Sequence, residues 1–161
     1  MKGNQKVIDA LQEVLTAELT AIHQYFIHAE MCENCGFSRL AATIKQDSIV
    51  EMRHAESAIE RMLFLDGAPN LSTPMKINVG QNIPDMFKND LALEHHAVTH
   101  YNIVMNLAAE LGDNGTRDLV LMFLKDEEGH VDFLETQLAM IDQMGLQNYL
   151  LLQSGGAAPA A

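Results

Sequence analysis

The feature that most constrains this chain is a Glu-x-x-His motif that occurs twice, as Glu51 with His54 and as Glu127 with His130. Residues three positions apart on an α-helix lie on one face, about one turn apart, so each pair can reach a single point between packed helices. A carboxylate and an imidazole placed in this way are suited to binding a metal ion. The motif is also common by chance in helices, so one copy alone would carry little weight.

Each copy of the motif is preceded by a further glutamate at the same distance. Glu18 lies 33 positions before Glu51, and Glu94 lies 33 positions before Glu127. Both upstream glutamates stand inside apolar patterns with helical periodicity. The chain therefore contains two copies of one plan, in which one helix supplies Glu and the next supplies Glu-x-x-His. We expect the following residues to meet in a two-metal site: Glu18, Glu51, His54, Glu94, Glu127 and His130.

This ligand set is typical of the di-iron carboxylate proteins with a ferritin-like fold, so the pattern is recognised and is not an independent deduction. Oxygen and nitrogen ligands without thiolate suit iron, manganese or zinc. Four carboxylates buried together would repel each other and lose their hydration, so bound cations are the natural compensation. Two Fe(II) ions held side by side can pass two electrons to one O2 or H2O2, which favours iron.

Two tyrosines keep the same register as the upstream glutamates. Tyr25 follows Glu18 by seven positions and Tyr101 follows Glu94 by seven, which returns to the same helix face after two turns. Each is either an ordinary aromatic residue of the bundle core or a hydroxyl that orients a bridging carboxylate across the bundle. We expect Tyr25 to have the second role and count it with the site residues.

Apolar residues recur at three- and four-residue steps through most of the chain. This periodicity predicts four long helices and a short fifth one, at about 4–33, 38–65, 84–111, 116–144 and 146–152. Residues 66–82, between the second and third helices, contain glycines and prolines that interrupt the pattern. A helix of about 30 residues is about 45 Å long, and about 14 extended residues span that distance. We therefore predict an all-α, ferritin-like four-helix bundle with a long crossover between its second and third helices and a short C-terminal helix.

Single residues define the predicted helix ends. Gly36 is expected to adopt the left-handed conformation after the first helix. Ser38 and Thr116 are expected to cap the second and fourth helices. At 161 residues the chain is long enough for one domain, which we place at 1–153. Residues 154–161 are mostly small, and we predict a disordered tail there.

Composition argues against several kinds of partner. The formal net charge of −12 disfavours nucleic acid, because its phosphates would repel such a chain, and suits a protein that handles cations. No apolar run approaches the roughly 18 residues of a membrane span, and the N-terminus lacks the apolar core of a signal peptide. We therefore expect no nucleic acid, no membrane and a cytoplasmic location.

The two cysteines, Cys32 and Cys35, form one C-x-x-C pair. A single pair cannot supply the four thiolates of a zinc site, and no βαβ pattern suggests a thioredoxin-type site. We expect free or structural thiols, with a redox or accessory metal role as the alternative.

Three histidines cluster on the third predicted helix, at His95, His96 and His100. His96 and His100 have the four-residue spacing of a metal-binding pair. All three fall off the helix face of Glu94, so we expect solvated or interfacial histidines, with adventitious metal binding as the alternative.

Along essentially its whole ordered length, the chain resembles the bacterioferritin family. The segments that carry the resemblance include Gln24-Tyr25-Phe26, Glu51-Met52-Arg53-His54-Ala55, Pro69-Asn70-Leu71, Asp126-Glu127-Glu128-Gly129-His130 and Gly145-Leu146. The family pattern places iron ligands at all six residues of the predicted two-metal site. It also implies a hollow homo-oligomeric cage of 24 subunits, built from dimers, that oxidises Fe(II) with O2 or H2O2 and stores it as ferric mineral.

The resemblance implies a second cofactor and further partners. The family pattern assigns haem ligation to Met52, with two subunits each giving one thioether to a shared haem b. Because Met52 follows Glu51, its side chain points about 100° away from the metal site, which suits an outer face shared between subunits. Without the resemblance, a helical methionine would be interpreted as core packing. The further implied partners are a second bacterioferritin subunit in a mixed cage and a ferredoxin-type electron donor for iron release.

The chain departs from the best-known family pattern at three positions. Gln46 and Val50 stand where some relatives carry His and Asp that bind iron on the inner surface, so we do not expect an inner-surface iron here. Cys35 replaces a Trp that is usual before Gly36. The six predicted metal ligands are unaffected.

Three functions remain open at this point. The first is an iron-storage ferroxidase, in which the bundle site oxidises Fe(II) and the acidic cage nucleates mineral. The second is a structural or haem-carrying cage subunit that relies on a different, catalytic subunit. The third is a stand-alone di-iron peroxidase or di-manganese catalase, which predicts a small assembly without a mineral core.

Overall fold

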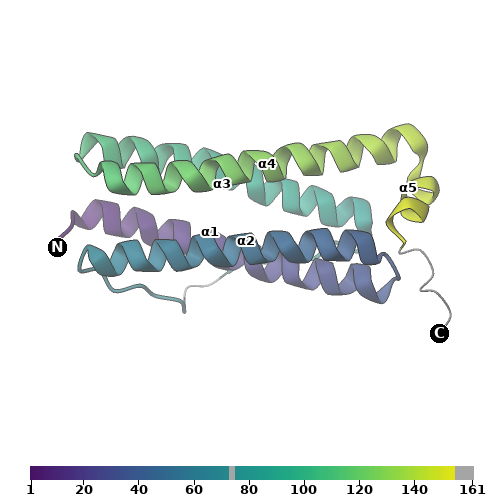
Figure 1. Cartoon of the computed structure of the whole chain (residues 1–161), viewed down its shortest axis with the longest axis horizontal. Coiled ribbons are helices and arrows are strands. Elements are labelled where there is room, and N and C mark those ends of the chain that lie inside the picture. Colours follow the sequence, from purple (N-terminus) through teal and green to yellow (C-terminus); the bar gives the residue numbers. More distant parts are fainter. Residues whose placement is uncertain (73–74, 155–161) are drawn as a thin grey trace.

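Five helices make up the regular structure of the computed structural model, which describes residues 1–72 and 75–154 (Figure 1). In chain order they are α1 (Gln5–Asn34), α2 (Ser38–Phe64), α3 (Ile83–Glu110), α4 (Asn114–Met144) and α5 (Leu146–Gln153). The predicted all-α fold class is confirmed. Each helix begins and ends within two residues of its predicted bounds.

The four long helices form a bundle in which α1 is antiparallel to α2 and α3 is antiparallel to α4 (Figure 1). The segment between α2 and α3 runs back along the bundle, and this makes α2 and α3 parallel. α1 packs against α2 and α3, and α4 packs against the same two helices. The predicted long crossover of a ferritin-like bundle is confirmed. Each of the four long helices carries predicted ligands, and the crossover lets these four stretches meet in one bundle.

Of the three predicted helix ends, one is confirmed and two are wrong. Gly36 has a φ of 82°, the left-handed conformation that reverses the chain after α1. Ser38 is already the first helical residue of α2, and Phe37 stands at the N-cap position without a side-chain hydrogen bond. Thr116 lies inside α4, where its backbone N–H donates to the carboxylate of the true cap, Asp113, at 3.0 Å. Aspartate is as good an N-cap residue as threonine, and Asp113 stands at the position from which its carboxylate can accept this hydrogen bond.

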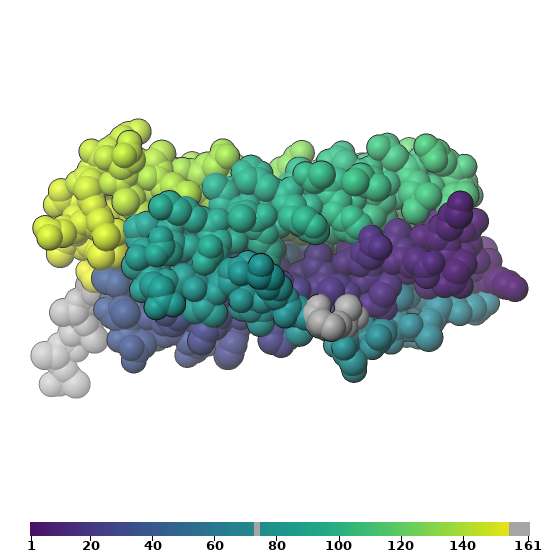
Figure 2. Space-filling model, turned by 180° about the vertical axis from the view of Figure 1, so that it is seen from behind, coloured from purple at the N-terminus to yellow at the C-terminus, as the bar shows by residue number. Residues whose placement is uncertain are grey.

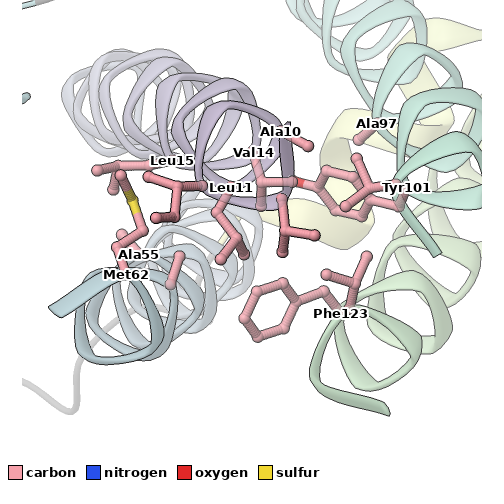
Figure 3. Packing of buried hydrophobic residues seen from close by; sticks show 14 of the residues in the cluster. Ala10, Leu11, Val14, Leu15, Ala55, Met62, Ala97, Tyr101 and Phe123 are labelled. Carbon is pink, nitrogen blue, oxygen red and sulfur yellow. The ribbon is translucent and has the colours of Figure 1, made fainter. Parts of the chain in front are cut away.

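Two apolar clusters fill the bundle, one on each side of the predicted ligands. On α1, Leu15 belongs to the first cluster and Ala21 to the second, and Glu18 lies between them. The other three long helices repeat this order of apolar, ligand and apolar residues. Figure 3 shows side chains of the first cluster: Leu15 of α1 and Met62 of α2 lie against each other between these two helices, and Phe123 of α4 points toward the middle of the bundle. The ligands therefore lie where apolar packing excludes water and the local dielectric is low.

Buried polar side chains fasten the crossover to the bundle. His28 Nδ1 lies 2.9 Å from Asp90 Oδ1, and His28 Nε2 accepts a hydrogen bond from the backbone N–H of Gly80 at 3.0 Å. Gln24 donates to Asp90 at 2.8 Å and accepts from the backbone N–H of Asn78 at 2.9 Å. This network holds the end of the crossover against α1 and α3 without using any predicted metal ligand.

α5 lies across one end of the bundle (Figure 1). Tyr149 anchors it, with its ring 6.2 Å from that of Phe87, centroid to centroid, and its hydroxyl 2.9 Å from Gln137 Oε1. Since Tyr149 is completely buried, these contacts tie the short helix to α3 and α4.

The domain bounds of 1–153 stay a prediction. Of the expected disordered tail, 154–161, only Ser154 belongs to the described part of the chain, and 155–161 lie outside it. Within the described part, no helix is both long and apolar enough to cross a membrane.

Candidate metal centre

The structure brings the six predicted ligands together at the middle of the bundle. Glu18 comes from α1 and Glu94 from α3, while α2 and α4 each contribute their Glu-x-x-His pair. Each of the four glutamates is only 1% exposed. Carboxylates are almost never buried to this extent unless they are paired or bind a metal, so the cluster requires compensating positive charge.

The ligand atoms fall into two overlapping groups. The members of the first are Glu18, Glu51, His54 and Glu127. The members of the second are Glu51, Glu94, Glu127 and His130. Within each group the ligand atoms lie within 4.8 Å of one another, and Glu51 and Glu127 belong to both. A carboxylate has two oxygens, so the two shared glutamates can bridge a pair of ions, each of which would also have its own glutamate and histidine.

Both imidazoles turn Nδ1 toward the shared carboxylates. His54 Nδ1 lies 3.1 Å from Glu51 and 3.3 Å from Glu127. His130 Nδ1 lies 3.0 Å from each of the same two residues. Because one N–H donates well to only one oxygen, Glu51 Oε1 and Glu127 Oε1 remain buried without a hydrogen-bond partner. Unpaired buried acceptors are costly, and a cation between the two groups would satisfy both.

The protonation states of these groups depend on one another. Burial raises the pKa of Glu18, and it raises the pKa of Glu94 to about 8. Burial acts in the same direction on Glu51, but the nearby imidazoles of His130 and His54 outweigh it and lower its pKa to about 2. For His54, burial lowers the pKa, and hydrogen bonds to the surrounding carboxylates overcome this and raise it to about 12. The cluster therefore holds protons at neutral pH, and metal ions must displace them.

Two tyrosines hold the unshared carboxylates from opposite sides of the α1–α3 contact. The Tyr25 hydroxyl on α1 donates to Glu94 Oε1, and the Tyr101 hydroxyl on α3 donates to Glu18 Oε1 at 2.5 Å. Burial raises the pKa of both phenols, which keeps them protonated as donors. The carboxylate that Tyr25 reaches belongs to one ligand group only, whereas we expected a bridging one. Tyr101 makes the equivalent contact, and the seven-residue register of the sequence applied equally to both.

The other edge of each imidazole faces a cavity of about 490 Å³ that opens between α2 and α4. Asp126 Oδ2 lies 3.1 Å from His54 Nε2, and Asp47 Oδ1 lies 4.0 Å from His130 Nε2. Neither aspartate stands out in the sequence pattern. Asp126 directly precedes a predicted ligand and Asp47 lies about one helical turn before another, but only the folded bundle shows which ring nitrogen each one faces.

The remaining residues singled out in the sequence lie outside the centre. The Met52 side chain on α2 is 48% exposed. Cys32 is buried and Cys35 is exposed, and both are free thiols. Burial raises the pKa of Cys32 to about 12, so its thiol is unreactive. The histidine cluster of α3 takes no part in either ligand group.

Comparison with known proteins extends the similarity over nearly the whole chain. Residues 8–144 match the family model of the ferritin-like domain. The chain is 41% identical to a bacterioferritin of Mycolicibacterium paratuberculosis over 149 residues, 92% of this chain and 94% of the relative. It is 41% identical to a bacterioferritin of Rhodobacter capsulatus over 154 residues, 96% of each chain. With a bacterioferritin of Brucella melitensis, 40% identity extends over 160 residues, 99% of this chain and 98% of the relative.

Substitution of a shared and an unshared carboxylate should have different effects on metal binding. Glu127→Gln removes a charge from both ligand groups, so the affinity for both metal ions should fall roughly 10–100-fold. Glu18→Gln should weaken only one of the two. Titration with Co(II), followed by its visible absorbance, distinguishes these outcomes. Glu128→Gln, an exposed neighbour on α4, is the matched control. Equal losses in the first two variants would contradict the division into shared and unshared ligands.

Metal binding to the centre should strengthen as the pH rises. The raised pKa values of Glu94 and His54 mean that protons occupy these groups at neutral pH and must leave when a metal ion binds. The affinity for Co(II) should therefore increase about tenfold per pH unit for each proton displaced, between about pH 6 and about pH 8. Titration in weakly buffered solution counts the released protons. A constant affinity across this range would mean that the carboxylates and imidazoles are already deprotonated before the metal binds.

Proposed function

This chain belongs to the bacterioferritin family of iron-storage proteins, and we propose that its buried centre is the ferroxidase that converts Fe(II) to Fe(III) for storage as ferric mineral. The observation that carries the proposal is the pair of overlapping ligand groups joined by Glu51 and Glu127. Oxygen and nitrogen ligands of this kind suit iron. Two Fe(II) ions bound there as substrate supply the two electrons that reduce O2 to peroxide or H2O2 to water, so no one-electron oxygen species needs to be released.

The surrounding residues have distinct parts in this proposal. In each half of the bundle, one glutamate and one histidine complete a metal position, and the shared carboxylates keep the two positions adjacent. Tyr25 and Tyr101 fix the orientation of the unshared carboxylates by hydrogen bonds. The apolar clusters exclude water on both sides along the bundle. The cavity between α2 and α4 is the route by which iron, oxidant and displaced protons exchange with solvent.

Membership of this family implies a multimeric storage cage. From the family pattern we propose 24 subunits assembled from dimers, either of this chain alone or mixed with a second bacterioferritin subunit. The net charge of −12 would raise the local concentration of Fe(II) at such a cage and favour nucleation of mineral. A ferredoxin-type electron donor for iron release and a cytoplasmic location complete the proposal.

The exposure of Met52 supports a role in binding a shared haem. Its side chain is 48% exposed on α2 and takes no part in the buried centre, so its thioether is available to a group held between two subunits. Among the exposed methionines it is the one that the family pattern matches. We propose that one Met52 from each of two subunits would hold haem b. Haem bound there would supply a one-electron carrier at the subunit interface.

Two alternative functions fit the observations less well. A purely structural or haem-carrying subunit would have no use for a complete ligand set, yet all six ligands converge in this chain. A stand-alone peroxidase or di-manganese catalase would share the ligand types, but the nearly full-length similarity is to bacterioferritins. Light scattering of the purified protein separates the large cage from the small assembly that the second alternative predicts.

Aerobic addition of Fe(II) should give a fast oxidation phase that ends at about two irons per chain, one for each ligand group. Glu127→Ala and His54→Ala each remove a ligand and should slow this phase at least roughly 100-fold. Stopped-flow absorbance of Fe(III) measures the rate, and Glu128→Ala serves as the control on α4. Wild-type protein without a fast phase would point to the structural or haem-carrying alternative.

Haem should depend on Met52 while iron oxidation should not. Met52→Leu keeps a similar apolar shape but removes the sulfur ligand, so the haem absorbance of the purified protein should disappear. The fast Fe(II) phase should remain. Met122→Leu is the matched control, because this methionine of α4 is also exposed, at 63%. Retention of haem in Met52→Leu would refute the assignment.

A further inference from the structure

Three buried side-chain atoms lack a hydrogen-bond partner in the described part of the chain: Glu51 Oε1, Glu127 Oε1 and His100 Nε2. The first two belong to the proposed ferroxidase centre, where a metal ion would satisfy them. His100 lies on α3 outside that centre. A buried polar atom without a partner is rare and requires an explanation.

The His100 nitrogen faces a carboxylate of the neighbouring helix. Glu13 Oε2 on α1 lies 3.6 Å from His100 Nε2, which is too long for a hydrogen bond. Two atoms that bind the same tetrahedral zinc ion, each about 2.0–2.1 Å from it, lie about 3.4 Å apart. In the ferroxidase centre, His54 Nδ1 and Glu18 Oε2 belong to one ligand group and are also 3.6 Å apart. The Glu13–His100 separation therefore fits two ligands of one ion as well as it fits an ion pair.

His96 provides a third ligand one helical turn before His100. The two imidazole rings are nearly parallel, at 19°, with centroids 6.2 Å apart. His96 is exposed and makes no hydrogen bond or ion pair with any described residue, so its side chain is free to rotate. The three side chains are not as close together as the ligands of the buried centre, so a site formed by all three requires the His96 side chain to rotate toward Glu13 and His100.

Solvent reaches these residues from the face on which α1 and α3 lie side by side (Figure 2). Glu13 lines two shallow cavities, one of about 430 Å³ that includes His96 and one of about 290 Å³ that includes His100. Glu13 thus shares one cavity with each of the two imidazoles. The other charged residues of these cavities are Lys76 in the first and Lys6 and Asp9 in the second, so Lys6 and Asp9 offset each other and the charge of Lys76 remains. Burial lowers the pKa of His100, which favours the neutral form that binds metals.

We propose that Glu13, His96 and His100 form a second metal site, on the α1–α3 face, for a late first-row divalent ion of the Zn²⁺ type. Two imidazoles, one carboxylate and a water molecule make a complete tetrahedral zinc site. Imidazole-rich sites also bind Zn²⁺ and Cu²⁺ more tightly than Fe²⁺. The site therefore differs in chemical preference from the carboxylate-rich ferroxidase centre, and it does not compete with that centre for iron.

Equilibrium dialysis of the assembled protein against Zn²⁺, followed by elemental analysis, tests the site. Wild-type protein should hold about three Zn²⁺ per chain, two in the buried centre and one at the α1–α3 face. His100→Gln and Glu13→Gln should each hold about one ion fewer. His95→Gln alters the neighbouring histidine of α3, which faces Glu135 at 3.8 Å, and should hold as many ions as the wild type.

Equal zinc contents in wild type and His100→Gln would overturn the proposal. A lower content in His100→Gln would also count against it if the fast Fe(II) phase were lost at the same time, because the effect would then lie in the buried centre. Zinc is counted directly, so the result does not depend on whether the chain oxidises iron. In Glu18→Gln, which alters only the buried centre, the ion at the α1–α3 face should be retained.

Discussion

The burial of charge is the constraint on which this structure depends. Four carboxylates and two imidazoles lie between two apolar clusters, where an unpaired charge costs on the order of several kcal/mol. The chain lowers that cost by directing imidazole nitrogens at the shared carboxylates and phenol hydroxyls at the unshared ones. A pair of bound cations would complete the neutralisation. The features that make the cluster costly without metal are therefore the ones that favour the proposed binding of metal.

The two halves of the bundle hold their unshared carboxylates in the same way, but they differ at the side that faces the cavity between α2 and α4. Tyr25 holds Glu94 and Tyr101 holds Glu18, so each half orients the unshared carboxylate of the other across the α1–α3 contact. Toward the cavity the equivalence ends. His54 Nε2 lies 3.1 Å from Asp126, whereas His130 Nε2 lies 4.0 Å from Asp47 of α2. The two copies of the sequence plan supply equivalent ligands, and the surroundings of the two ligand groups differ.

The positions of the ligands could be predicted because they follow from local helix geometry. A three-residue step fixes Glu51 and His54 on one face, and the repeated 33-residue interval fixes the helix that faces them. The partner of Tyr25 and the contact of Asp126 with His54 could not be predicted, since each depends on which helix packs opposite. The predictions of Ser38 and Thr116 as N-caps were wrong for a related reason. Several residues near a turn can accept the same backbone hydrogen bond, and only the folded turn decides which one does.

The network around His28 and Asp90 is separate from the proposed iron ligands. It holds the crossover in place, and the apolar clusters hold the helices, without the participation of any proposed iron ligand. Loss of iron from the proposed centre would therefore leave these contacts of the fold in place. A cage built from such subunits can be drained in periods of scarcity and reloaded in periods of supply without being dismantled or made anew.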